Sequence, residues 1–181
     1  MQNSLIFLVK TISDLYLLTF LLRIVLQWVR VDFYNPISQF VLRATEPLVS
    51  PLRRVLPRSR RMDIAALIIL LLLECIATWL LLSLAGLDLA VISFLQIVAF
   101  RAVALVLWLY TICILVYVIL SWVAQAQYSP VAALLRDIVH PVLQPVRRVI
   151  PLLGGLDLSP LLVLIMIQAV SIALPLPNFL R

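Results

Sequence analysis

Four long apolar stretches, separated by short segments that carry most of the arginines, constrain this chain more than any other feature. They cover residues 5–29, 64–86, 102–124 and 158–177. Each has the roughly 20 residues that a helix needs to cross the hydrocarbon core of a bilayer. Hydrophobic residues make up 65% of the chain and charged residues 12%, which leaves too little polar surface for a soluble domain. The sequence therefore predicts an all-α membrane protein with four transmembrane helices.

The distribution of arginine predicts how these helices are oriented. Seven arginines lie between the first and second stretches and three between the third and fourth, whereas the central connection offers only Asp88 and the flanking Arg101. Because basic loops stay on the cytoplasmic side, both arginine-bearing loops are expected there and both termini outside. Residues 87–101 are apolar but short. They either lie in the outer interface or extend the third transmembrane helix.

A constant offset of 94 positions relates the two halves of the chain. Six positions of the first half recur in the second without a gap, as the pairs Trp28/Trp122, Pro36/Pro130, Pro47/Pro141, Pro51/Pro145, Pro57/Pro151 and Asp63/Asp157. Chance similarity between apolar segments would not match at these residue types, so the sequence indicates a duplication. The predicted repeats are residues 1–86 and 102–181, joined by an outer connection at 87–101. Since each repeat holds two transmembrane helices, the repeats are parallel and related by an axis along the membrane normal.

Each repeat contains a cytoplasmic loop, residues 30–63 or 125–157, that we call its elbow. Asn35-Pro36 and Ser129-Pro130 predict helix starts, with an N-cap side chain and proline at the first helical position. An apolar stripe follows at helical spacing, formed by Ile37, Phe40, Val41 and Ala44 in the first elbow and by Val131, Leu134, Leu135 and Ile138 in the second. Both helices therefore suit the membrane interface. Pro47 and Pro141 are expected to end them.

The most distinctive motif is Pro-x-x-x-Pro-x-Arg-Arg-x-x-Pro, which runs from Pro47 to Pro57 and again from Pro141 to Pro151. We expect an extended-to-turn path here that leads to Asp63 or Asp157, the cap of the next transmembrane helix. Three interpretations of the arginine pairs stay open: anchoring to anionic lipid, ion pairing with the aspartates, and docking of a partner protein. The four arginines are Arg53, Arg54, Arg147 and Arg148.

Ionisable residues at membrane depth are costly and mark candidate functional sites. Glu74 lies near the middle of the second apolar stretch, and Arg23 lies about one helical turn off its depth, close enough to reach toward it. The alternatives are an Arg23–Glu74 ion pair, a neutral Glu74, and an ion or proton pathway. Nearer the outer end, Lys10 and Asp14 are spaced as an i, i+4 ion pair.

Catalytic constellations are missing from the sequence. It has one histidine, three glycines and no paired carboxylates, and Cys75 and Cys113 lie apart in apolar stretches. We therefore expect no enzymatic activity and no cofactor. The net charge of +6 resides in short loops between apolar stretches, so anionic phospholipid is a nearer partner than nucleic acid.

On these residues the chain resembles the YggT family, called YlmG in some bacteria and in plastids. The resemblance covers nearly the whole length, through Trp28, Asn35-Pro36, Pro47 to Pro57 and Asp63, and through the same positions of the second repeat as far as Gly154-Gly155-Leu156-Asp157. Arg58-Ser59-Arg60-Arg61 departs from the family pattern, in which a glycine-rich step to the aspartate is commoner.

The resemblance implies a protein of the bacterial inner membrane without established catalysis. In that membrane the outer side, where the arginine distribution places both termini, is the periplasm. Relatives are linked to osmotic tolerance, to cell division or nucleoid organisation, and in plastids to haem attachment. We expect a scaffold or accessory protein whose elbows bind anionic phospholipids and dock a membrane-protein partner or a second copy of the chain. The alternatives are a small ion transporter that uses Glu74, and a cofactor assembly factor.

Overall fold

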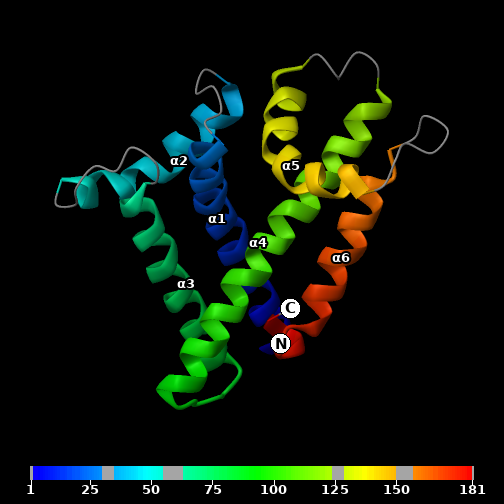
Figure 1. Cartoon of the computed structure of the whole chain (residues 1–181). Helices are drawn as coiled ribbons and strands as arrows, with labels where there is room; N and C mark the ends of the chain where they lie inside the picture. Colours follow the sequence, from blue (N-terminus) through cyan, green and yellow to red (C-terminus); the bar gives the residue numbers. More distant parts are fainter. Residues whose placement is uncertain (1, 30–34, 55–62, 124–128, 150–156, 181) are drawn as a thin grey trace.

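The computed structural model describes residues 2–29, 35–54, 63–123, 129–149 and 157–180, and its regular structure there is helical throughout. Four helices form the body of the molecule: α1 (Gln2–Val29), α3 (Ile64–Leu84), α4 (Val91–Trp122) and α6 (Ser159–Ala173). The elbow helices α2 (Pro36–Arg53) and α5 (Pro130–Val149) lie together at one end of the body (Figure 1). Both termini lie at the opposite end, where the short 3-10 helix η2 (Asn178–Leu180) follows α6. We call these the elbow end and the terminal end.

Three helices of the described part, α1, α3 and α4, are long and apolar enough to cross a membrane. The fourth predicted stretch contains a shorter apolar helix, α6, whose 15 residues rise about 22 Å at 1.5 Å per residue. This helix ends at Ala173 because the next residue, Leu174, precedes Pro175 and has extended backbone angles. The helix α4 begins at Val91, so residues 91–101 extend the third span, one of the two arrangements that the sequence left open.

The elbow helices do not end where the sequence predicts. Pro47 and Pro51 lie inside α2, and Pro141 and Pro145 lie inside α5, so the expected stops at Pro47 and Pro141 are wrong. The two prolines of each helix are exposed and four residues apart, so they lie on the same side of the helix. Proline has no backbone N–H, so two hydrogen bonds of the helix are missing on that side. A helix that lacks hydrogen bonds on one side bends there and need not end. Figure 1 shows α5 changing direction midway along its length.

The predicted helix starts are confirmed. The Asn35 side chain accepts a hydrogen bond from the Ile37 amide at 3.0 Å, and Ser129 Oγ accepts one from the Ala132 amide at 3.1 Å. The Asn35 side chain has a second role, because its Nδ2 donates to the carbonyl of Pro130 at 2.7 Å. This bond ties the start of one elbow helix to the start of the other.

The buried faces of the elbow helices match the predicted stripes only in part. In α5 the residues Leu134, Leu135 and Ile138 are buried as expected. In α2 the buried face is instead formed by Ser38, Val41, Thr45 and Val49, and Phe40 is 69% exposed. The stripe predicted for α2 was therefore rotated by about one residue, because two polar residues, Ser38 and Thr45, occupy inward positions.

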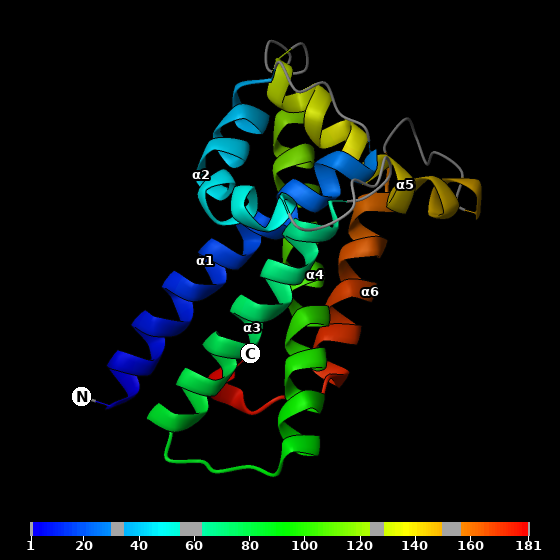
Figure 2. The same ribbon diagram turned by 90° about the vertical axis from the view of Figure 1, so that its left-hand side faces the viewer.

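One apolar core joins the body to the elbows. Phe20 and Leu26 of α1 and Ile114 of α4 are almost fully buried in it, as are Val49 of α2 and Ile138 of α5. Small residues line the part of α3 nearest the elbows, where Ala65 and Ala66 are buried and allow a close helix contact. The view in Figure 2 agrees with Figure 1 that both elbow helices cap the same end of the bundle.

Candidate functional site

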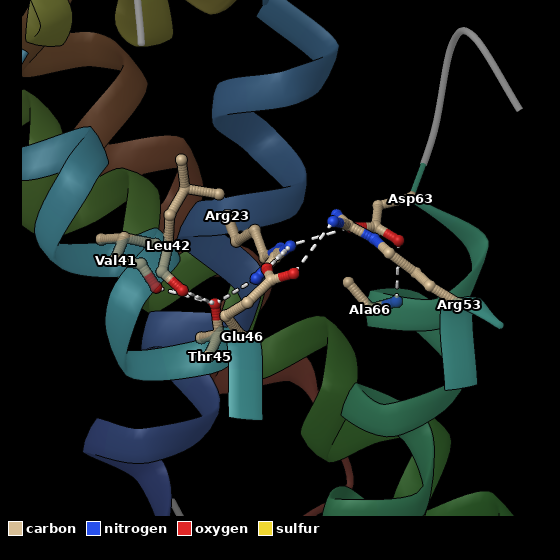
Figure 3. A network of polar contacts seen from close by, with 8 residues as sticks. All are labelled: Arg23, Val41, Leu42, Thr45, Glu46, Arg53, Asp63 and Ala66. Carbon is tan, nitrogen blue, oxygen red and sulfur yellow. Dashed lines mark hydrogen bonds and ion pairs between the residues drawn. The ribbon is translucent and has the colours of Figure 1, made fainter. Parts of the chain in front are cut away.

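The first elbow is held against the body by a network of four charged residues, which we call the elbow network. It comprises Arg23 of α1, Glu46 and Arg53 of α2, and Asp63 at the start of α3 (Figure 3). Arg23 donates to Glu46 at 2.7 Å and to Asp63 at 3.3 Å, and is only 2% exposed. Its third bond runs to the Thr45 hydroxyl at 2.6 Å. Every nitrogen of this buried guanidinium therefore has an acceptor.

Arg53 closes the elbow network from the other side. It pairs with Asp63 and donates to Glu46 at 3.3 Å, so two cations and two anions alternate around a ring. Asp63 also caps α3, since its Oδ1 accepts a hydrogen bond from the Ala66 amide at 3.3 Å. The predicted cap role of Asp63 is confirmed, and the structure contains the ion pair between Arg53 and the aspartate of its own repeat, which was one of the three interpretations.

The elbow network keeps Asp63 ionised. Burial alone would raise the pKa of this carboxyl, but hydrogen bonds from Arg53 and from the Ala66 amide, with the charges of Arg53 and Arg23, lower its pKa below the ordinary value. The same contact, mainly through the hydrogen bond to Asp63, raises the pKa of Arg53. The network is therefore an assembly of charged groups, which suits the interface next to a bilayer better than its interior.

The second elbow uses the same motif with fewer partners. Arg147 donates to Asp157 at 2.8 Å, 94 positions after the Arg53–Asp63 pair. Burial of Asp157 would raise its pKa, but its hydrogen bonds with Ser159 and Arg147 hold the pKa below the ordinary value. Tyr117, which occupies the position of Arg23, also interacts with Arg147. Asp157 lies one residue before the N-cap of α6 and accepts from the Ser159 amide at 3.0 Å.

The second arginine of each pair has a different environment from the first. Arg54 and Arg148 are exposed, as are Arg43 and Arg136 on the same two helices. Phe40 and Leu48 of α2 are exposed as well, so its surface combines cations with large apolar side chains, as interfacial helices do. Trp28 and Trp122 lie in the last turns of α1 and α4, at the elbow end, and are 60% and 81% exposed. Aromatic residues are enriched in this way at membrane interfaces.

A second group of charges, the deep network, lies farther along the body toward the terminal end. Arg101 of α4 pairs with Glu74 of α3 at 3.1 Å and with Asp14 of α1 at 2.8 Å. Asp14 in turn accepts from Lys10 at 2.8 Å, which confirms the predicted i, i+4 pair. The Arg23–Glu74 pair suggested by the sequence is wrong, because Arg23 turns toward the elbow and Arg101 reaches Glu74 from another helix.

The deep network borders a cavity of about 310 Å³. Its charged lining comes from Lys10, Asp14, Glu74 and Arg101, and its apolar lining includes Trp108 of α4 and Leu176 of the C-terminal segment. Among the described residues no group of histidine, cysteine, aspartate or glutamate side chains is arranged to hold a metal ion. Cys75 and Cys113 are free thiols.

Sequence reasoning missed three members of these networks. Glu46 is the single acid of α2, but the equivalent position of the second repeat is His140. Comparison of the two repeats therefore did not indicate that an acid is needed there. Thr45 was hidden because threonine is common on apolar helix faces. Arg101 was treated as a flanking residue, although a helix that starts at Val91 places it well inside α4. The motif prolines Pro57 and Pro151, with Arg30, Arg58, Arg60 and Arg61, lie outside the described residues.

A family model and several bacterial proteins match this chain over most of its length. The family model described as CCB3/YggT matches residues 2–85 and again residues 95–177. An uncharacterized protein of Pseudomonas aeruginosa is 39% identical over 173 residues, which cover 94% of this chain and 88% of that protein. The uncharacterized YggT protein of Escherichia coli K12 is 36% identical over 174 residues, with the same two coverages. An uncharacterized protein of Vibrio alginolyticus is 37% identical over 175 residues, or 92% of this chain and 91% of its own length. No solved structure matches.

Proposed function

The chain belongs to the CCB3/YggT family, and from that premise we propose that it is a non-enzymatic scaffold of the bacterial inner membrane whose elbows bind anionic phospholipids. In this proposal α1, α3, α4 and α6 all cross the bilayer as two parallel repeats. The elbow end faces the cytoplasm, where the arginine-bearing loops are expected, and both termini face the periplasm. The short α6 spans with the help of the extended segment that follows it.

The observation that carries this proposal is that the two arginines of each pair have different environments. The first arginine, Arg53 or Arg147, is engaged with the aspartate at the start of the next body helix. The second, Arg54 or Arg148, directly follows it in the chain and is exposed. The ion pair therefore fixes the place of the elbow, and the exposed guanidinium, which has no ion pair with another described residue, is left to donate hydrogen bonds to a phosphate. Arginine binds phosphate through two parallel N–H donors, and each arginine near an anionic leaflet contributes about 1 kcal/mol.

The proposal is tested by lipid retention on the purified full-length protein. Native mass spectrometry of the protein with phosphatidylglycerol or cardiolipin, against phosphatidylcholine, counts the bound lipids. We expect Arg54→Gln with Arg148→Gln to reduce anionic lipid retention several-fold and to leave thermal stability close to that of the wild type. Equal retention of anionic lipid by this variant and the wild type would refute lipid binding by the elbows.

The matched control is the neighbouring pair of arginines. Arg53→Gln with Arg147→Gln removes the same charge, but we expect it to lower stability because Asp63 and Asp157 lose their partners. If this control lost lipid as strongly as the Arg54/Arg148 variant while remaining folded, net charge alone would explain binding, and the proposed separation of roles would be wrong.

Docking of a protein partner is the second part of the proposed scaffold role. The exposed surface of α5 supports it, because it carries Arg136, Asp137 and His140 but, among the side chains that the structure describes, no large apolar one such as Phe40 of α2. A polar surface of mixed charge suits a protein better than it suits the acyl region of a bilayer. We propose that this partner is a membrane protein or a second copy of the chain, in a process such as osmotic tolerance or division. Crosslinking from native membranes through Gln144→Cys, an exposed position of α5, tests this, and absence of any crosslinked protein would count against docking.

A further inference from the structure

A small pocket, which we call the α5 pocket, lies between the end of α4 and the start of α5, at the elbow end. Its volume is about 230 Å³, and its lining consists of Tyr117, Leu120 and Ser121 of α4 with Ala132 and Arg136 of α5. Figure 1 shows that the first half of α5 runs back along these last turns of α4. The pocket is smaller than the roughly 300 Å³ at which sites for whole small molecules begin, so it suits one group of a larger ligand.

Arg136 is the charged residue in the lining of the α5 pocket. Its side chain is exposed, and its guanidinium has no ion pair or hydrogen bond with another described residue. The acid next to it in the chain, Asp137, does not line the pocket. Because a guanidinium carries five N–H donors and no acceptor, the pocket presents donors that an anion could use.

Tyr117 supplies a second donor. It interacts with Arg147, and because a guanidinium only donates hydrogen bonds, the Tyr117 oxygen is the acceptor in this contact. The O–H of Tyr117 is then left to donate to a ligand. Arg147 is paired with Asp157 at 2.6 Å, so these two charges compensate each other and the charge of Arg136 stays unbalanced.

The equivalent space of the first repeat is closed. The residues that stand 94 positions before three of the lining residues are Arg23, Leu26 and Ser38, and none of them is more than 2% exposed. An acid of the chain itself lies there, because Glu46 pairs with Arg23 at 2.7 Å. The second repeat has His140 at the position of Glu46, so its elbow lacks the corresponding anion.

The charge balance points to a ligand with one negative charge. The elbow network of the first repeat holds two arginines and two acids. Around the α5 pocket, Arg136 and Arg147 are accompanied by Asp157. One further negative charge would give the second repeat the balance of the first. A phosphodiester carries one negative charge, and its two free oxygens match the parallel N–H donors of an arginine.

The level of the pocket in the molecule favours a lipid as the source of this phosphodiester. Ile119 and Trp122, on the same last turns of α4, are 57% and 81% exposed, which is typical of a helix end at the membrane interface. Basic pockets between helices on the cytoplasmic side of a membrane bind anionic lipid headgroups. A pocket of about 230 Å³ has room for the phosphate group and leaves the acyl chains outside.

We propose that the α5 pocket is a specific site for one anionic phospholipid, whose phosphate accepts hydrogen bonds from Arg136 and from the Tyr117 hydroxyl. The first repeat has Leu42 in place of Arg136, so the chain binds one lipid in this way. The inference rests on the proposed function for the placement of the elbow end at an anionic leaflet, but it uses neither arginine of the exposed pair. Asp137 and His140 do not line the pocket and stay available to a protein partner.

Stepwise lipid binding to the purified full-length protein tests the proposal. Native mass spectrometry resolves the successive bound lipids in a titration with phosphatidylglycerol. We expect the first lipid to bind about tenfold more tightly than those that follow, because it alone has a pocket with two convergent donors. Equal affinities for the successive lipids would overturn the proposal, since diffuse attraction to exposed arginines creates no distinct site.

Variants then place the first lipid. Arg136→Gln removes the guanidinium, so we expect the affinity for this lipid to fall about tenfold. Ser121→Leu reduces the pocket volume without changing charge and should weaken the same binding step. Arg43→Gln, at an exposed arginine of α2, removes an equal charge elsewhere and is the matched control, which should bind the first lipid as the wild type does. Unchanged binding of the first lipid by folded Arg136→Gln and Ser121→Leu proteins would refute the assignment.

The deacylated headgroup, glycerophosphoglycerol, tests the source of the phosphate. We expect it not to displace the first lipid at equal concentration, because it lacks the acyl chains that hold a lipid at the interface. Displacement at equal concentration would overturn a lipid site in favour of a site for a soluble phosphodiester.

The Arg54→Gln with Arg148→Gln variant separates this inference from the proposed function. Loss of the first lipid in that variant but not in Arg136→Gln would refute the α5 pocket and leave lipid binding by the exposed arginine pair standing. Loss in Arg136→Gln alone, with all other lipid binding unchanged in the double variant, would refute the role of Arg54 and Arg148 and support the α5 pocket.

Discussion

At the scale of single residues, Asp63 is the acid on which the first elbow depends. It accepts from Arg23, Arg53 and the Ala66 amide, and Arg23 has almost no exposure to solvent. Replacing one member of a buried ion pair leaves the other charge poorly compensated, at a cost of about 3 to 5 kcal/mol. Because Glu46 and Thr45 still contact Arg23, we expect Asp63→Asn to lower the free energy of unfolding by about 3 kcal/mol. An SDS titration in mixed micelles, followed by circular dichroism, measures it.

The repeat supplies the control for this prediction. Asp157 makes the equivalent contact with Arg147, but the two side chains are 29% and 34% exposed. Ion pairs in contact with solvent contribute at most about 1 kcal/mol. We therefore expect Asp157→Asn to cost less than a third as much as Asp63→Asn. Equal costs for the two variants would contradict the view that burial of Arg23 makes the first elbow the stronger one.

The pKa of Asp63 adds a pH dependence of stability. The folded pKa is lowered relative to an unfolded value of about 3.9, so Asp63 contributes stability that is fully present above that unfolded value. This stability is lost as the pH falls through the folded pKa, because the protonated acid no longer pairs with Arg53. We expect the difference in unfolding free energy between the wild type and Asp63→Asn to be constant from pH 7 to about 5 and to shrink below about 4. A difference that stays constant down to pH 2 would show that Asp63 is not stabilised as an anion.

At the scale of elements, the starts of the elbow helices could be predicted from the sequence, but their ends could not. Their starts were predictable because an N-cap residue followed by proline is a local signal, and Asn35 and Ser129 both act as predicted. Their ends were not, because the effect of a proline depends on whether its side of the helix faces neighbours or solvent. Pro47 and Pro141 are exposed, so the helices bend and continue for several residues.

The prolines inside α2 lead to a further prediction, at the scale of elements. Pro47→Ala with Pro51→Ala restores two N–H donors and favours a straight helix by up to about 3 kcal/mol per site, which would draw Arg53 away from Asp63. Spin labels at Gln39→Cys and Arg54→Cys, both exposed, report the separation of the two ends after Cys75→Ala and Cys113→Ala. We expect the distance to lengthen toward the roughly 22 Å that 15 residues of straight helix span. Pro36→Ala, at the first helical position, should leave the distance unchanged, and a wild-type distance in the double variant would refute a proline-induced bend.

At the scale of the whole molecule, the apolar helices and their order could be predicted, but the partners of Arg23, Glu74 and Arg101 could not. Apolar length marked α1, α3 and α4, and the offset of 94 residues marked the elbows. The predicted ion pair between Arg23 and Glu74 was wrong because the sequence allowed several partners for each of the two residues. The choice depended on how α2 folds back onto α1 and on where α4 begins. Both are tertiary features: the first brings Glu46 to Arg23, and the second brings Arg101 to Glu74.

The number of membrane crossings is the remaining prediction for the whole molecule. The body helices run alternately between the elbow end and the terminal end, so α6 returns the chain to the terminal end, where Asn178 follows it (Figure 1). With four crossings, a membrane-impermeant maleimide should label Asp88→Cys and Asn178→Cys from outside intact spheroplasts, and should label Gln144→Cys only after lysis. Cys75 and Cys113 are first replaced by alanine. If α6 did not cross, Asn178→Cys would behave like Gln144→Cys, because an odd number of crossings places the two ends of the chain on opposite sides. Labelling of Asp88→Cys serves as the internal standard. Residue 88 follows α3 and precedes α6, so its side of the membrane does not depend on whether α6 crosses.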